Sequence, residues 1–377
     1  MSKSGPAPVR IAVLFGGRSG EHEVSLMSAR SLLAVLEPAR YAVTQVGITH
    51  EGAWLTGEDV LGKFESGRVE DLKPVLVSPD PSSPGLHLFD GSRLEKLTDV
   101  DVFFPVLHGT SGEDGTIQGL FELANAAYVG AGVAGSAVGM DKGIFIDVMV
   151  ANGVPVVETL LVLRSEIERD LDGVIRRAGT LGNYPLFTKP ANLGSSVGIT
   201  RCASPSDLHE GLREAASYDR RILVQRGVRN AREIEVSVLG NDEPQASVPG
   251  EVLPSREFYS YESKYVDGTS RLVIPAQLPA GMADEIRRLA VRAYKAVDCS
   301  GMARVDFLVE GDTQRVYLNE INTIPGFTQI SMYPKLWEAS GLPYPRLVDR
   351  LIELALERKA DRDRTQHTFK SSGRSMG

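Results

Sequence analysis

The chain has 377 residues, of which 42% are hydrophobic and 24% are charged, and its formal net charge is −8. This profile is typical of a globular protein with roughly two to three domains and a sizeable core. The basic residues are scattered, which argues against the basic face that nucleic acid requires, and no apolar run approaches the roughly 20 residues of a membrane span. We therefore expect neither nucleic-acid binding nor membrane insertion.

The two cysteines, Cys202 and Cys299, do not have the spacing of a metal knuckle or a redox pair. We interpret them as buried reduced thiols, which favours a reducing, cytoplasmic setting. The N-terminus lacks the apolar stretch of a signal peptide. Residues 1–8 are rich in proline and small side chains, and residues 361–377 are polar without periodicity, so we expect tails at both ends, the second of them disordered.

Residues 1–139 alternate between strand and helix patterns. Apolar runs predict strands, and apolar side chains at helical spacing predict helices; in chain order these are strand 9–15, helix 24–36, strand 41–49, strand 99–109 and helix 115–130. Such alternation indicates a parallel α/β sheet, in which ligands bind beyond the carboxyl ends of the strands. Two polar segments stand at such ends, "GGRSGEHE" and "LHGTSGEDG".

The pattern over residues 140–225 predicts a small domain of sheet and helix. A helix begins near Met140 and ends at Gly153 and Pro155. The pattern then predicts two strands joined by a Gly/Ser hairpin over 184–202, a helix and a further strand, "RILVQRGV".

Residues 226–360 predict a third unit, with strands at 232–240, 302–309 and 315–322 and a helix at 282–297. The segment 254–270 is long for a connection, and long connections are usually functional lids or disordered. Its four aromatic residues argue against disorder. We therefore expect a mobile lid at 254–270.

The segment "YLNEIN" (317–322) places a carboxylate and an amide, Glu320 and Asn322, on one face of an apolar strand, because residues two apart share a face. Arg304 and Asp306 share a face of the preceding strand in the same way. If the two strands form an antiparallel hairpin, Asp306, Glu320 and Asn322 converge. This all-oxygen set suits Mg²⁺ with substrate phosphates completing its shell; the alternative is a solvated polar strand face.

The segment "GSSVG" (194–198) lies between two apolar strands. Its small residues allow backbone N–H groups to approach phosphate oxygens, and Lys189 can add a positive charge. A plain flexible hairpin is the alternative. Neither a P-loop nor a dinucleotide-binding glycine pattern is present.

The first loop carries Glu21, His22 and Glu23, and either acid can stabilise the start of a helix. His108 follows an apolar strand in "PVLHG", and a lone histidine at such a place is about as often structural as functional.

Eight motifs stand in the order and context found in D-alanine–D-alanine ligases, over roughly residues 9–358. They are "GGRSGEHEVS", "HGTSGEDGTIQG", "MDK", "TKPANLGSSVG", "REIEVSVLGN", "FYSYESKY", "ARVDF" and "NEINTIPGFTQISMYP". The chain thus resembles this family, whose members are ATP-grasp enzymes of peptidoglycan precursor synthesis. The resemblance implies a fold that is α/β, with α+β character in the ATP-binding half. It also implies three domains, with ATP between the central lid domain and the C-terminal domain.

The resemblance further implies that ATP and two D-alanines yield D-alanyl-D-alanine, ADP and phosphate through an acyl phosphate. It implies two Mg²⁺ ions, which Mn²⁺ can replace, and it raises K⁺ as a possible monovalent cofactor. A homodimer is the assembly that it suggests.

Residue roles follow from matching these motifs to the family. Asp306, Glu320 and Asn322 match the metal ligands, the trio that the strand argument brings together. The residues of this chain that match the family's ATP site are Lys142, Lys189, Ser195, Ser196, Gln225, Glu233 and Lys264. Those that match the family's D-alanine-binding or catalytic groups are Glu21, His108, Ser195, Tyr265, Arg304, Gly326 and Ser331.

Tyr265 bears on specificity, since family members that make the ester D-alanyl-D-lactate often have Phe there. Tyr therefore favours dipeptide synthesis. Departures from the family pattern are Gln225, where Glu usually contacts adenine, Asp147 in place of a common lysine, and Thr188 in place of a common valine. The alternatives are an ATP-grasp ligase for another amino-acid or hydroxy-acid pair, and an ATP binder without catalysis.

Overall fold

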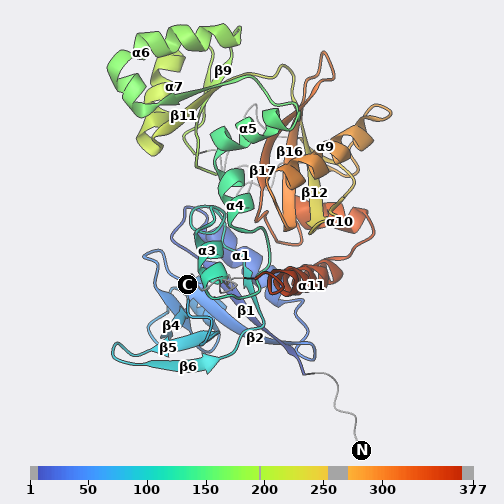
Figure 1. Ribbon diagram of the computed structural model, residues 1–377. Coiled ribbons are helices and arrows are strands. Elements are labelled where there is room, and N and C mark those ends of the chain that lie inside the picture. Colours follow the sequence, from blue (N-terminus) through green and yellow to red (C-terminus); the bar gives the residue numbers. More distant parts are fainter. Residues whose placement is uncertain (1–6, 195–196, 254–270, 367–377) are drawn as a thin grey trace, which may run out of the picture.

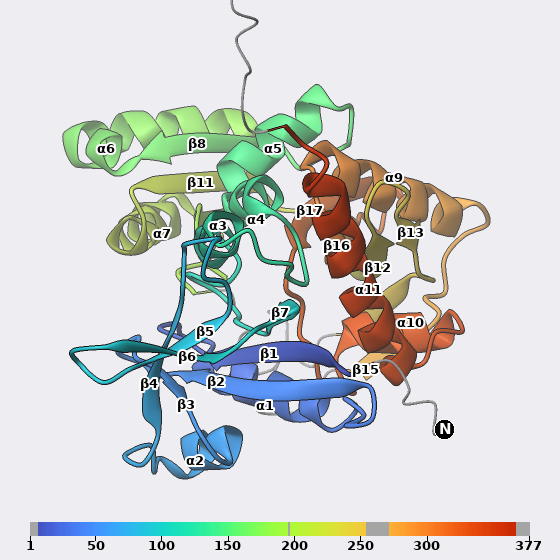
Figure 2. The same cartoon turned by 60° about the horizontal axis from the view of Figure 1, so that its bottom comes forward.

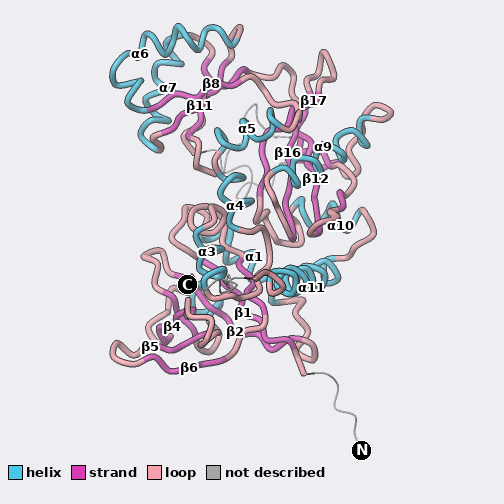
Figure 3. The backbone as a smooth tube through the Cα atoms, viewed as in Figure 1, coloured by secondary structure: helices cyan, strands magenta, loops and turns pink. Residues whose placement is uncertain are grey.

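The computed structural model describes residues 7–194, 197–253 and 271–366, which form three sheets with helices against them (Figures 1 and 3). The N-terminal sheet lies at one end of the molecule. The other two sheets lie at the opposite end, and the short helices α4 (Val133–Met140) and α5 (Lys142–Ala151) lie in the middle of the molecule (Figure 1).

The N-terminal sheet has the strand order β6-β5-β4-β3-β2-β1-β7. Its strands are β1 (Val9–Gly16), β2 (Tyr41–Ile48), β3 (Trp54–Thr56), β4 (Lys73–Val77), β5 (Leu86–Phe89), β6 (Leu94–Thr98) and β7 (Val102–Pro105), and its helices are α1 (His22–Leu33), α2 (Val60–Ser66) and α3 (Thr116–Leu123). The predicted parallel pairing holds for β2, β1 and β7, whereas β3 to β6 extend the sheet with antiparallel pairs.

Strand β1 is buried on both faces, as its continuous apolar run indicates. Ile11 and Phe15 belong to a core with α1 and with the C-terminal helix α11 (Tyr344–Arg362), whereas Leu14 belongs to a core with Phe121 of α3. Because both faces are covered, the end of β1 is rigidly placed. The loop that carries Glu21 leaves from this end.

The second sheet is antiparallel throughout, in the order β10-β9-β11-β8. Its strands are β8 (Thr159–Leu163), β9 (Leu186–Pro190), β10 (Thr200–Cys202) and β11 (Arg221–Arg226), with α6 (Arg164–Ala178) and α7 (Pro205–Tyr218) forming its core on one side. The first helix of this region, α5 (Lys142–Ala151), is capped by Asp141, whose Oδ1 accepts from the N–H groups of Gly143 and Ile144 at 3.0 Å.

The third sheet has the order β15-β14-β12-β16-β17, with β13 paired to β12. Its strands are β12 (Arg232–Gly240), β13 (Gln245–Ala246), β14 (Gly250–Leu253), β15 (Arg271–Val273), β16 (Gly301–Val309) and β17 (Val316–Asn322). Its helices are α9 (Met282–Ala296) and α10 (Met332–Ala339). Phe145 and Met149 of α5 share a core with this sheet and with α9, so α4 (Val133–Met140) and α5 join the parts of the molecule (Figure 2).

Candidate functional site

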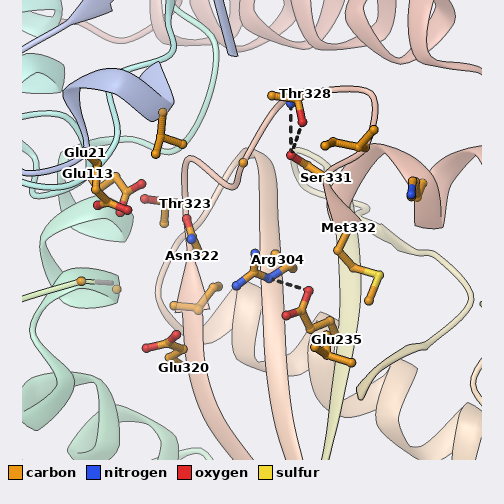
Figure 4. Close-up of a pocket in the computed structure, with 18 of the residues that line it drawn as sticks. Glu21, Glu113, Glu235, Arg304, Glu320, Asn322, Thr323, Thr328, Ser331 and Met332 are labelled. Carbon is orange, nitrogen blue, oxygen red and sulfur yellow. Dashed lines mark hydrogen bonds and ion pairs between the residues drawn. The ribbon is translucent and has the colours of Figure 1, made fainter. Parts of the chain in front are cut away.

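A cavity of about 530 Å³ lies where the three parts of the chain meet (Figure 4). The N-terminal part contributes Glu21 and Glu113, and the central part contributes Lys142 and Gly194. The third sheet and the segment after it contribute most of the remaining wall, including Glu235, Arg304, Glu320, Asn322, Gly326 and Ser331. The cavity thus collects many of the predicted site residues from segments far apart in the sequence.

The predicted hairpin forms the floor of this site. Strands β16 and β17 pair antiparallel, with Asp306 opposite Glu320 and Arg304 opposite Asn322. The register shifts directly after Asp306, and such bulges re-aim side chains. Glu320 and Asn322 project from the same strand in Figure 4. The predicted hairpin is therefore present and places Asp306 opposite Glu320, although of the three residues only Glu320 and Asn322 line the cavity.

The donor set fits a hard cation. Asn322 Oδ1 is buried and accepts no hydrogen bond from the described part of the chain. A buried oxygen without a donor is costly, so a ligand for it is expected. Two carboxylates and an amide oxygen are the ligands that Mg²⁺ prefers.

Arg304 links this floor to the next strand. Its guanidinium donates to both carboxylate oxygens of Asp306, at 2.7 and 2.6 Å, and lies 3.1 Å from the carboxylate of Glu235 on β12 (Figure 4). Arg304 lines the cavity, whereas its partner Asp306 does not. A planar guanidinium held from two sides is pre-organised to face developing negative charge.

Two lysines approach the floor from the central part. Lys142 Nζ donates to the carbonyl of Leu193 at 2.8 Å and lies 3.7 Å from Glu320. Lys189, on β9, donates from Nζ to Gln225 Oε1 at 2.8 Å. Burial lowers the pKa of Lys189 to about 8, although Glu320 and Glu233 of the third sheet act to raise it. Both lysines therefore stand within the field of the C-terminal carboxylates.

Gln225 is itself fixed in orientation. Its Oε1 accepts from Lys189 and its Nε2 donates to Thr159 Oγ1 at 3.1 Å. The predicted adenine contact thus lies next to a predicted phosphate lysine.

The N-terminal wall contains a residue that the sequence analysis missed. Glu113 lines the cavity next to Glu21, and its Oε1 lies 3.7 Å from His108 Nδ1 (Figure 4). His108 is buried, contacts the carbonyl of Ile324 through Nδ1 at 2.9 Å and contacts Ser28 Oγ through Nε2 at 2.8 Å. The sequence feature that could have indicated Glu113 is its position five residues after His108 in a glycine-rich turn.

The tight backbone of this turn brings Glu113 close to His108. A Cβ on Gly112 would lie 1.9 Å from the carbonyl oxygen of Leu107, so no side chain fits there. Burial raises the pKa of Glu113 to about 7, and the Glu21 carboxylate adds to this. Burial acts to lower the pKa of His108, but its contact with Glu113, the Glu21 carboxylate and the Ile324 carbonyl together raise it.

Gly326 and Ser331 close the opposite wall. Ser331 precedes α10, its Oγ accepts from the Thr328 N–H at 3.2 Å, and it contacts Thr328 Oγ1 at 2.8 Å. A Cβ on Gly326 would lie 3.1 Å from Ser331 Oγ, so the bare backbone leaves room at this wall.

The comparisons with known proteins decide the family. Two family models match the chain: D-ala D-ala ligase N-terminus over residues 10–131, and D-ala D-ala ligase C-terminus over residues 148–353. This chain belongs to the D-alanine–D-alanine ligase family.

Relatives and solved structures agree with this assignment to the D-alanine–D-alanine ligases. A D-alanine–D-alanine ligase of Heliobacterium modesticaldum is 49% identical over 354 residues, covering 94% of this chain and 96% of the relative, and one of Caldicellulosiruptor bescii is 50% identical, covering 93% and 96%. The structure of the D-alanine–D-alanine ligase from Coxiella burnetii aligns with a TM-score of 0.80 at 37% identity, covering 94% and 96%. The VanG D-Ala:D-Ser ligase from Enterococcus faecalis aligns with a TM-score of 0.82 at 35% identity, covering 93% and 100%.

The predicted α/β class and ATP-grasp fold of this D-alanine–D-alanine ligase family member are thereby confirmed. Among the described residues no helix is long and apolar enough to cross a membrane. Ser195, Ser196, Lys264, Tyr265 and the predicted lid 254–270 lie outside the residues that the structure describes.

Proposed function

We propose that this chain joins two D-alanines to D-alanyl-D-alanine at the expense of ATP, for peptidoglycan precursor synthesis. The observation that carries the proposal is that one cavity combines two kinds of residue. Lys142, Glu320 and Asn322 suit a metal–phosphate group, whereas Glu21 and Arg304 suit an amino acid. The names of the relatives, which cover nearly the whole chain, support the same reaction.

In the proposed reaction the carboxylate of the first D-alanine attacks the γ-phosphorus of ATP, and the bond from that phosphorus to the β–γ bridging oxygen breaks to release ADP. The amine of the second D-alanine then attacks the acyl-phosphate carbonyl, loses a proton and expels inorganic phosphate. Arg304 and the Gly326 N–H are proposed to stabilise the oxyanion of the tetrahedral intermediate. Such donors act most strongly where water is excluded.

We propose that Asp306, Glu320 and Asn322 hold two Mg²⁺ ions, with Mn²⁺ as a substitute, and that K⁺ is an optional monovalent cofactor. The orphaned Asn322 Oδ1 supports the metal assignment. When bound, the metal neutralises charge on the β- and γ-phosphates. Asp306 would have to give up part of its contact with Arg304 to serve as a metal ligand.

The ATP site is proposed to lie between the second and third sheets. The ion pair of Lys142 with Glu320 and the electrostatic influence of Glu320 on Lys189 support a place for the phosphates there. Its members are Lys142, Lys189, Ser195, Ser196, Gln225, Glu233 and Lys264.

The amino-acid site is proposed to lie against the N-terminal wall. Glu21 receives the ammonium of the first D-alanine, and His108 stands beside the same substrate. Ser331 holds the second D-alanine. Ser195 and Tyr265 are proposed to partner Glu21 in a hydrogen-bonded triad, and Tyr265 to favour an amine over a hydroxyl as the second nucleophile.

The test is ATP-dependent phosphate release with D-alanine alone and with D-lactate or D-serine as competing second substrate, with product identity read by mass spectrometry. The expected product is D-alanyl-D-alanine. D-serine belongs in the test because one similar structure is a D-Ala:D-Ser ligase. Absence of D-alanine-dependent phosphate release overturns the proposal, and a preference for D-lactate or D-serine overturns the dipeptide specificity.

We further propose three functional units, residues 1–139, 140–225 and 226–360; the expected mobile lid at 254–270 lies outside the described residues. The expectation of a disordered polar tail at 361–377 is wrong at its start, because α11 continues to Arg362. We propose a homodimer that works in the cytoplasm. The family resemblance supports the dimer, and two buried cysteines outside any disulfide support a reducing setting. Sedimentation equilibrium tests the dimer.

A further inference from the structure

A cluster of metal-ligating side chains lies outside the cavity, at the start of α1. His22, Glu23 and His50 each offer one ligand atom, and these three atoms lie within 4.8 Å of one another. His22 and Glu23 belong to the first turn of α1, and His50 follows β2. None of the three lines the cavity at the centre of the molecule.

His22 is oriented by a contact with the backbone. Its ring is buried, and Nδ1 contacts the Gly17 carbonyl oxygen at 2.9 Å. A carbonyl oxygen only accepts, so Nδ1 is the donor in this contact and Nε2 is the nitrogen left for a metal. Metal-binding histidines are typically fixed by such a contact on the other ring nitrogen.

The other two side chains are free to adjust. The rings of His22 and His50 stack with centroids 3.8 Å apart and planes at 23°, and His50 Nε2 lies 3.7 Å from Glu23 Oε1. The side chains of Glu23 and His50 are 71% and 61% exposed. Two ligands of a tetrahedral Zn²⁺ stand roughly 3.3 Å apart. An imidazole lone pair lies in the ring plane, so His50 must leave its stack on His22 before both rings can reach one ion. The exposure of His50 and Glu23 leaves room for this rotation around the buried His22.

The charge around the cluster is compatible with a cation. A helix start disfavours positive charge, but Glu23 supplies a carboxylate 3.7 Å from His50 Nε2.

We propose that His22, Glu23 and His50 bind one divalent transition-metal ion of the Zn²⁺ type, with water in the remaining position. Two imidazoles and one carboxylate form a borderline ligand set that Zn²⁺ or Co²⁺ prefers over Mg²⁺. This site is separate from the oxygen-only set on β16 and β17. It therefore stands or falls independently of the proposed ligase reaction.

The test is Zn²⁺ titration of the full chain, freed of any histidine tag, by calorimetry in millimolar Mg²⁺ so that the hard-cation site is filled. Co²⁺ is the spectroscopic probe, since four-coordinate Co²⁺ absorbs visibly. One ion per chain is expected, and His50→Gln should weaken its binding by at least about tenfold, given that loss of outer-shell partners alone costs about 10–100-fold.

Glu23→Gln should weaken Zn²⁺ binding in the same way. His209→Gln, on the surface of α7, is the matched control and should bind Zn²⁺ as the unmodified chain does. Since His50 and Glu23 are exposed, their variants should keep the unmodified melting temperature without metal. If the unmodified chain binds no more Zn²⁺ than His50→Gln, the cluster is a plain ion pair and the proposal fails.

Discussion

Asp306 on β16 and Glu320 on β17 lie directly opposite each other in the C-terminal sheet. Two carboxylates in register repel each other unless a cation lies between or beside them. Here Arg304 pairs with Asp306, and Lys142 lies 3.7 Å from Glu320. These cations offset the repulsion between the two carboxylates, whereas Asn322 Oδ1 has no donor among the described residues.

We expect Glu320→Gln to raise the Mg²⁺ concentration for half-maximal phosphate release by roughly tenfold or more. The amide keeps the shape of the side chain but removes the charge that attracts the metal. Mn²⁺ binding followed by electron paramagnetic resonance gives a second measurement that does not depend on turnover. Glu353→Gln, an exposed acid of α11, is the control; equal Mg²⁺ requirements in both variants would contradict the metal assignment.

Arg304→Ala should lower kcat by roughly 10²–10³-fold, by analogy with the loss of one oxyanion donor, about 3 kcal/mol. Arg304→Lys should recover only part of this, because an ammonium lacks the planar fork. The KM for ATP should change little in either variant. Steady-state kinetics with both substrates varied make the distinction.

The chain offers a matched control for Arg304. Arg232 also donates to both oxygens of one carboxylate, Glu251 on the neighbouring strand, at 2.7 and 2.8 Å, but does not line the cavity. Arg232→Ala should cost comparable thermal stability while leaving kcat nearly unchanged. A kcat for Arg304→Ala within tenfold of the unmodified enzyme would rule out the oxyanion role.

The β16–β17 hairpin shows what the sequence could predict. The period of two and the short "EGDTQ" connection sufficed to bring Asp306 and Glu320 together, because both are local properties. The helix expected at 115–130 was too long, since it ends at Leu123 and Asn125 adopts φ +50°. The prediction took Gly130 as the residue that ends the helix. Asparagine can also adopt the left-handed backbone conformation that ends a helix, and Asn125 does so here.

The pairing of Glu113 with His108 could not be predicted from spacing alone. It depends on the close approach of Gly112 to Leu107, and on Ile324 and Ser28 arriving from distant segments. The antiparallel strands β3 to β6 were missed for a related reason. Short strands at the edge of a sheet carry little periodicity, and their pairing is decided by neighbours.

Replacing Glu113 with Gln should change how stability depends on pH. The pKa of Glu113 is raised to about 7 and that of His108 is also raised, so the folded state holds extra protons. Stabilisation from such groups is full below the unfolded pKa and is lost as pH rises through the folded pKa. The advantage of the unmodified chain over Glu113→Gln should therefore shrink between about pH 4.5 and pH 7.

Melting temperatures of both proteins at pH 5, 6, 7 and 8 test this expectation. Glu70→Gln, which alters an exposed acid of the same part of the chain, should track the unmodified protein throughout. If the melting temperature of the unmodified chain increasingly exceeds that of Glu113→Gln as pH rises, the predicted direction is wrong.

The contact between Lys189 and Gln225 makes a prediction about the pH dependence of ATP use. Because the pKa of Lys189 is lowered to about 8, kcat/KM for ATP should fall above about pH 8 as the ammonium loses its proton. Gln225→Glu places a carboxylate 2.8 Å from Nζ, where Oε1 now accepts, and an adjacent negative charge favours the protonated form. The fall of kcat/KM for ATP at alkaline pH, the alkaline limb of the pH profile, should then move to higher pH.

Gln225→Met separates charge from contact, because it removes the Oε1 acceptor without adding a carboxylate. Burial continues to lower the pKa of Lys189 in that variant, so its alkaline limb should stay near or below that of the unmodified enzyme. Lys189→Met should abolish the limb and raise the KM for ATP. If Gln225→Glu leaves the alkaline fall unmoved while Lys189→Met removes it, the residue at position 225 does not set the protonation of Lys189, and the predicted influence of a neighbouring carboxylate is wrong.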